Sequence, residues 1–175
     1  MKKTLQIMML ALLAFGMMAC GEKTLTQDDL KKAERTLFDK EGNINSDVAP
    51  AVAEKYCEFV EQNPNDSTAT LWLYHALEIN VMLKDVEKSE AVCNKLIEMY
   101  PTSRYAPRAL YLLGSFIYED ELKDLDRARE TYERIINAYP DSELIPSVEK
   151  SIEYLGMSPD EIMSLIMMNQ MPEDD

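Results

Sequence analysis

The apolar residues of this chain recur at the spacing of an amphipathic helix. The clearest stripe has six members: Leu125, Ala128, Tyr132, Ile135, Ile136 and Tyr139. Steps of one, three and four residues place them on one face of a helix. Pro140 follows directly, and the residue before a proline is biased away from the α region. The pattern therefore predicts an amphipathic helix over 125–138.

This pattern occurs three times along the chain. The residues Leu-Lys-Asp-Val at 83–86 return 39 positions later as Leu-Lys-Asp-Leu at 122–125, and the register holds to a Tyr-Pro pair that ends each copy. An earlier copy, containing Tyr56 and Pro64, precedes the matching positions of the second by 37 residues. Repeats of this length stack so that each buries its apolar face on its neighbours. We therefore expect an all-α solenoid of helix pairs.

Helix start and stop signals divide the chain further. Thr26 with Asp29 resembles a capping box that opens a helix reaching to Lys40, followed by a loop. Gly156 is a helix stop, and Ser158 begins a last helix. Between these signals the predicted helix pairs are 48–62 with 67–83, 86–99 with 105–121, and 125–138 with 143–155.

The third copy is similar to a known repeat. It resembles the tetratricopeptide repeat at four places, which are Leu113-Gly114, Ala128, Tyr132 and Pro140. The resemblance implies a right-handed helix-pair solenoid of tetratricopeptide repeats over 26–156, with a C-terminal capping helix. The copy carries two extra residues between Gly114 and Ala128, and the preceding copy has His75 in place of the glycine. The Tyr-Pro endings look most like the bacterial-envelope subfamily that includes the BamD lipoprotein and the CpoB-type periplasmic proteins.

The N-terminus is predicted to be a sorting signal. Lys2 and Lys3 precede an apolar run of 15 residues, Leu5 to Ala19. This run is shorter than the ~20 residues that span a bilayer as a helix, and such a charged start with a short apolar run is typical of a secretory signal. The sequence Ala19-Cys20 resembles a lipobox, which implies a signal peptide over 1–19, a lipid on Cys20 and a tether over 20–25. An ordinary signal peptide with a chance cysteine is the alternative.

The charge excludes one class of partner. The chain has 18 Lys and Arg against 32 Asp and Glu, a net charge of −14. Nucleic acid binding needs clustered basic residues, so no nucleic acid partner is expected.

The residues suited to metal binding or catalysis are few. The one histidine, His75, leaves few ways to build a metal site, so no metal is expected. No catalytic constellation stands out, so no enzyme activity is expected either. Cys57 and Cys93 are expected to be structural thiols that stay reduced.

The family resemblance also implies a partner-binding surface. In tetratricopeptide repeats the first helix of each repeat, which here is 67–83 or 105–121, turns set positions toward a concave groove. These positions are Trp72, Ile79, Arg108, Tyr111, Ser115 and Tyr118. Trp72 and Tyr111 then stack at equivalent places in neighbouring repeats, and aromatic and arginine side chains often anchor interfaces. The alternative is that the rings fill the core between helices.

The C-terminal segment, 157–175, combines a Met-rich helix with an acidic tail. The spacing of its apolar residues is enough for the helix to cap the end of the solenoid. The surplus Met163, Met167 and Met171 form a second stripe that could dock a partner instead.

The whole sequence predicts a lipid-anchored protein–protein interaction scaffold of a bacterial outer membrane, on its periplasmic face, in an envelope assembly or secretion complex. A peptidoglycan- or glycan-binding accessory lipoprotein is the alternative function. No cofactor is expected besides the covalent lipid on Cys20.

Overall fold

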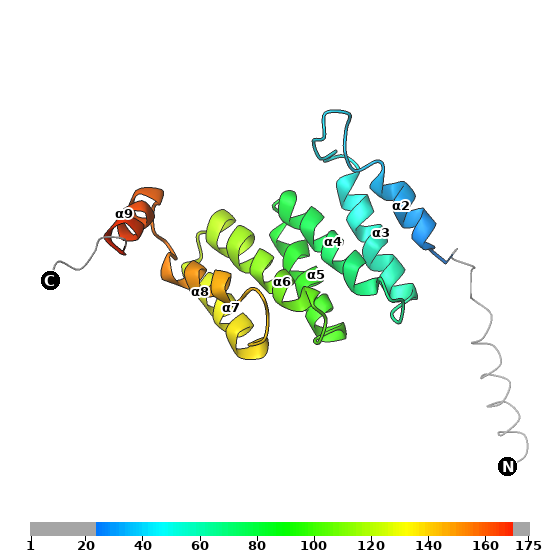
Figure 1. Ribbon diagram of the computed structural model, residues 1–175. Helices are drawn as coiled ribbons and strands as arrows, with labels where there is room; N and C mark the ends of the chain where they lie inside the picture. Colours follow the sequence, from blue (N-terminus) through cyan, green and yellow to red (C-terminus); the bar gives the residue numbers. More distant parts are fainter. Residues whose placement is uncertain (1–23, 170–175) are drawn as a thin grey trace, which may run out of the picture.

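The computed structural model describes residues 24–169, and residues 1–23 and 170–175 lie outside that description. The described elements are α2 (Gln27–Glu34), α3 (Ala49–Gln62), α4 (Ala69–Met82), α5 (Val86–Met99), α6 (Tyr105–Leu112), η1 (Leu113–Glu121), α7 (Leu125–Ala138), α8 (Ile145–Glu153) and α9 (Pro159–Asn169). Figure 1 shows α2 to α8 stacked in an elongated row, with α9 beyond the α8 end. The predicted all-α helix-pair solenoid is confirmed.

The N-terminal helix begins as predicted and ends earlier. The Thr26 hydroxyl accepts a hydrogen bond from the Asp29 N–H, and the Asp29 carboxylate accepts one from the Thr26 N–H, so the capping box is present. The helix α2 ends at Glu34, before the expected Lys40. The connection to α3 instead forms a small loop in which Phe38 and Ile44 make an isolated antiparallel bridge.

The helices α3, α5 and α7 stack in register. We call them the second helices, because α5 follows α4 and α7 follows α6–η1 within one repeat. Tyr56, Cys93 and Tyr132 occupy the same place in these three helices, and all are buried. Ion pairs join neighbours along the stack: Lys88 Nζ lies 2.9 Å from Glu54 Oε1, and Arg127 Nη1 lies 2.9 Å from Glu90 Oε1. The two offsets read from the sequence, 37 and 39, therefore hold for the second helices.

The turns that lead into α5 and α7 are alike. Asp85 and Asp124 cap these helices by accepting a hydrogen bond from the backbone N–H three residues later. The preceding residues, Lys84 and Lys123, adopt the left-handed conformation with φ of 57° and 55°. Glycine is the usual residue for such a conformation after a helix, so both turns carry backbone strain.

The helices α4, α6–η1 and α8, which we call the first helices, do not keep a single offset. The N–H groups of Ala69 and Ala106 donate to the carbonyls of Asp66 and Ser103, both at 3.0 Å, so the first turns of α4 and α6 match at an offset of 37. The helices end 39 residues apart, because α4 ends at Met82 and η1 ends at Glu121. The two extra residues therefore lie inside the helix, where η1 absorbs them as π-helical turns.

This register corrects one expectation from the sequence. Because the first helices begin at an offset of 37, Trp72 matches Ala109, and both are buried. Tyr111 matches Tyr74 instead, and both are half-buried. The prediction that Trp72 and Tyr111 stack at equivalent places is wrong, because the offset of 39 applies only after the π-helix.

The helix α9 lies where a capping helix is expected, but it covers little. Gly156 turns the chain ahead of α9 with φ of 79°, and a Cβ there would approach Leu125 Cδ1 to 2.7 Å. The core ends with Val148 of α8. Ile162 and Leu165 are half-buried, whereas Met163 and Met167 are exposed.

Candidate functional site: the outer face of the first helices

The first helices bring together some of the predicted groove residues and bury others. Trp72 is 6% exposed and Ile79 is 2% exposed. Neither lines an open surface, so the prediction that these two residues face a groove is wrong. Arg108 is exposed, and Tyr111, Ser115 and Tyr118 are half-buried.

Trp72 is a core residue between α3 and α4. Its ring centroid lies 4.9 Å from that of Tyr56 on α3 and 5.8 Å from that of His75 on its own helix. The indole Nε1–H donates to Thr68 Oγ1 at 3.0 Å, so its polar group is satisfied inside the protein. The alternative in which this ring fills the core is the one that the structure supports.

Three of the four remaining residues, Arg108, Tyr111 and Tyr118, contact neighbouring helices or the loop that precedes α8. Arg108 pairs with Glu143, and the Tyr111 hydroxyl lies 3.2 Å from Ser151 Oγ. The Arg127 guanidinium carbon lies 4.4 Å from the Tyr118 ring centroid. Burial, together with a hydrogen bond to Glu90, raises the pKa of Tyr118 to about 12. These side chains are therefore fixed in place before any partner arrives.

A polar pocket of about 440 Å³ opens between η1 and α8. Tyr111, Ser115 and Ser151 contribute to its wall. The Tyr132 hydroxyl donates to Glu119 Oε2 at 2.8 Å beside it. The Ser115 Oγ is buried and has no hydrogen-bond partner among the described residues. The pocket therefore offers hydroxyl groups and aromatic edges to a ligand.

A second depression, which we call the Phe116 pocket, lies between α4 and η1 and has a volume of about 640 Å³. Its lining is formed by Glu78, Val81, Met82, Lys84, Leu112, Phe116, Asp120 and Glu121. Phe116 is 51% exposed and Met82 is 49% exposed. The sequence prediction missed this pocket. The signal for it was present, because Leu112 and Phe116 lie one turn apart and outside the apolar stripe of the helix.

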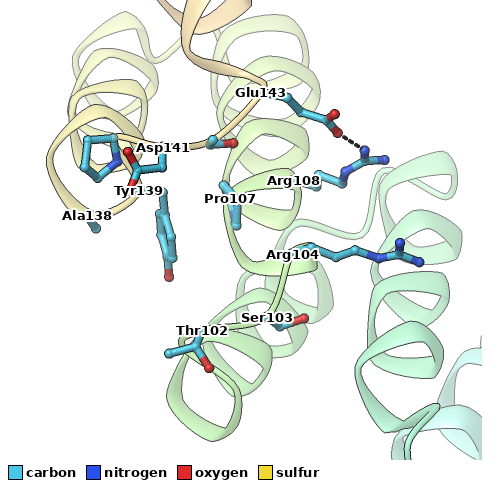
Figure 2. A pocket seen from close by; sticks show the side chains of 11 residues that line it. Thr102, Ser103, Arg104, Pro107, Arg108, Ala138, Tyr139, Asp141 and Glu143 are labelled. Atoms are coloured by element: carbon cyan, nitrogen blue, oxygen red, sulfur yellow. Dashed lines mark hydrogen bonds and ion pairs between the residues drawn. The ribbon is translucent and has the colours of Figure 1, made fainter.

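A third depression, of about 650 Å³, lies between the loops that precede α6 and α8 (Figure 2). Arg108 pairs with Glu143 at one edge of it, and Arg104 extends in the same direction as Arg108 without joining this pair. The Arg104 guanidinium donates to the Tyr105 hydroxyl at 2.9 Å and packs against the same ring. The two loops that form it follow the Tyr-Pro pairs at 100–101 and 139–140.

The groups suited to chemistry are few in the described part of the chain. Between residues 24 and 169 no cluster of His, Cys, Asp and Glu could hold a metal ion. His75 Nδ1 lies 2.8 Å from Glu78 Oε2. Cys57 and Cys93 are free thiols. Burial raises the pKa of both, to about 12 for Cys93, so neither is activated as a nucleophile.

Two predicted features fall outside the description. Cys20, the predicted lipid attachment site, and Met171 of the predicted docking stripe lie in the segments 1–23 and 170–175. The helices described over 24–169 are all too short or too polar to cross a bilayer.

The stacked helix pairs define the chain as a helical-repeat protein. Residues 108–142, which comprise most of α6, η1 and α7, match the family model of the tetratricopeptide repeat. These residues are therefore similar to a tetratricopeptide repeat, and within them Gly114 packs so closely against the Tyr132 ring that a Cβ would approach it to 2.9 Å. No curated protein and no solved structure shows a significant match to the chain.

Proposed function

We propose that this protein is a lipid-anchored scaffold of a bacterial outer membrane, on its periplasmic face, and that it binds a protein partner through the outer face of its first helices. Tetratricopeptide repeats are typically interaction modules, and this chain contains one at 108–142. The observation that carries the proposal is the apolar surface left open on this face, where Met82 and Phe116 are both about half exposed. Exposed apolar patches with a polar rim mark interaction sites.

The anchor is supported by the sequence. The lipobox-like Ala19-Cys20 follows a short apolar run with a charged start. The net charge of −14 repels anionic headgroups, so attachment has to come from acyl chains, which contribute ~0.8 kcal/mol per buried CH₂. Gly21 in place of an aspartate favours the outer membrane.

The anchor is tested by membrane fractionation of cells that make the Cys20→Ala variant. We expect loss of the lipid and release of the protein into the soluble envelope fraction. The Cys57→Ala variant is the matched control, because it also removes one cysteine and should stay with the membranes. Salt-resistant membrane association of Cys20→Ala would refute the lipid anchor.

The scaffold role is tested by cross-linking in intact cells. A photoreactive residue at Arg108, on the first-helix face, should capture a protein of the envelope, because this side chain is exposed. The same group at Glu130, exposed on α7, is the control and should capture none. Failure of the probe at Arg108 to capture a protein, or equal capture from Glu130, would contradict the scaffold proposal.

The polar pocket favours a second function, that of a glycan- or peptidoglycan-binding accessory lipoprotein. Tyr111 and Ser151 there offer a ring and hydroxyl groups of the kind that bind sugars. Calorimetric titration with soluble muropeptides should then give a binding heat that Tyr111→Ala removes. No heat with muropeptides would exclude this function.

A further inference from the structure

The Phe116 pocket is a consequence of the π-helix. Up to residue 115 the burial of α6 and η1 follows that of α4 at an offset of 37. At this offset Phe116 matches Ile79, yet Ile79 is 2% exposed and Phe116 is 51% exposed. The π-helical turns rotate the side chain from the core side of the helix to its outer side. π-helical turns in otherwise α-helical segments are frequent at functional sites.

The pocket combines an apolar floor with an acidic rim. Val81, Met82 and Leu112 surround Phe116, and they leave room for a large side chain. Three carboxylates line the pocket, those of Glu78, Asp120 and Glu121, against one ammonium group, that of Lys84.

The single cation is already paired. Lys84 Nζ lies 2.6 Å from Glu121 Oε2, and this contact raises the pKa of Lys84. The lining still has more carboxylates than ammonium groups, because Asp120 on η1 and Glu78 on α4, whose Oε2 lies 2.8 Å from His75 Nδ1, add to the Lys84–Glu121 pair. An incoming group therefore meets a surface that is apolar in the middle and anionic at its edges.

We propose that the Phe116 pocket binds a partner-protein segment in which a large apolar side chain is flanked by Lys or Arg. The apolar side chain packs between Met82 and Phe116, and the flanking cations lie against Glu78 and Asp120. This inference rests on the scaffold function and specifies the chemistry of its partner. Complementary charge at the rim of an interface speeds association and excludes acidic segments.

The charge also decides against two other occupants. The exposed methionines of α9 in a second copy are apolar enough for the pocket, but Asp160 and Glu161 open that helix, and like charges at the rim oppose its docking. An anionic lipid surface meets the same repulsion. A basic segment of another protein is the occupant that the rim favours.

The test uses a fluorescein-labelled amphipathic peptide of Ala, Leu and Lys, of about 15 residues so that it can form a helix. The matched acidic peptide has Glu at every Lys. By fluorescence polarisation on the purified chain lacking residues 1–19, we expect the Lys peptide to bind and the Glu peptide not to bind. Phe116→Ala should raise the dissociation constant for the Lys peptide about tenfold or more, as expected for an interface anchor.

Two control variants separate the pocket from general effects. Phe38→Ala also truncates a half-exposed phenylalanine, far along the chain and with no change in charge, and should leave the dissociation constant unchanged. Asp120→Asn should weaken binding of the Lys peptide, whereas Asp126→Asn, which removes an exposed carboxylate of α7, should not. Thermal melts by circular dichroism verify that each variant is folded.

The outcomes are distinct from those of the scaffold test. Equal binding of the two peptides, or an equal effect of Phe116→Ala and Phe38→Ala, would overturn the proposed partner chemistry. If cross-linking from Arg108 still captures a protein in cells that make Phe116→Ala, the scaffold function stands and the Phe116 pocket is not its binding site. If Phe116→Ala abolishes that capture while Phe38→Ala retains it, the pocket is the site.

Discussion

Truncating Trp72 to alanine provides a direct test of how the first helices are oriented. The ring is buried against Tyr56, with 6% of the residue exposed, so its removal leaves a cavity between α3 and α4. Large aromatic truncations in cores cost about 3–5 kcal/mol. The lost hydrogen bond adds less, because Thr68 Oγ1 keeps its other partner, donating to Asp66 Oδ1 at 2.5 Å. We expect a total loss of about 3–5 kcal/mol in the free energy of unfolding.

The same structure predicts a much smaller cost at Phe116. About half of that residue stays in solvent in the folded chain, at 51% exposed. Full burial of a phenylalanine side chain stabilises by about 1.5–3 kcal/mol, so Phe116→Ala should cost only about 1 kcal/mol. Trp72→Phe gives an intermediate case, since it keeps most of the buried ring and loses only the bond to Thr68.

The assay is urea unfolding followed by far-ultraviolet circular dichroism. Tryptophan fluorescence is unsuitable, because Trp72 is the chain's one tryptophan and the variant removes the signal itself. Similar slopes of free energy against urea for each variant would show that the comparison is valid. If Trp72→Ala cost no more than Phe116→Ala, Trp72 would have to lie on the surface, and the offset of 37 for the first helices would be wrong.

Two further predictions concern the thiols and the strained turns. Alkylation without reductant at a pH of about 8 should label Cys93 only after denaturation, because burial raises the pKa of this thiol to about 12. A disulfide between Cys57 and Cys93, found by mass spectrometry, would contradict this. Lys123→Gly should stabilise the chain by about 0.5–1 kcal/mol in urea unfolding, because φ of 55° favours glycine. Lys84→Gly should gain less, since it also removes the ion pair with Glu121; a larger gain there would show that strain is not the cause.

The second helices were predictable because their signals are local. A stripe of apolar residues and a Tyr-Pro or Asn-Pro pair at the end mark each of them in its own sequence. An aspartate caps the start of α5 and α7, whereas α3 follows Val48 and has no side-chain cap. The capping box of Thr26 and the stop at Gly156 are of the same kind. Such signals need no knowledge of which neighbour a helix contacts, so the solenoid followed from them.

The first helices were harder because a π-helix has no comparable sequence signal. The turns at 83–86 and 122–125 lie 39 residues apart, but this offset does not extend back along the helix to Trp72 and Tyr111. An insertion inside a helix leaves both ends intact and changes only the direction of the residues between them. The sequence shows that two residues were added, but it does not show whether a loop or a helix contains them.

The two extra residues lie in η1, and this position explains why Phe116, which the sequence did not predict as a binding residue, is exposed. In the second helices, two additional residues would rotate Tyr56, Cys93 or Tyr132 out of a stack in which all three are buried. The outer side of the first helices faces solvent, so η1 can turn Phe116 outward while Gly114 and Ile117 stay in the core. The π-helical turns are therefore accommodated in η1, where they alter the surface, and would disrupt the core if they lay in α3, α5 or α7. The surface that they alter is the one between α4 and η1, where the apolar floor and the carboxylates of Glu78 and Asp120 meet.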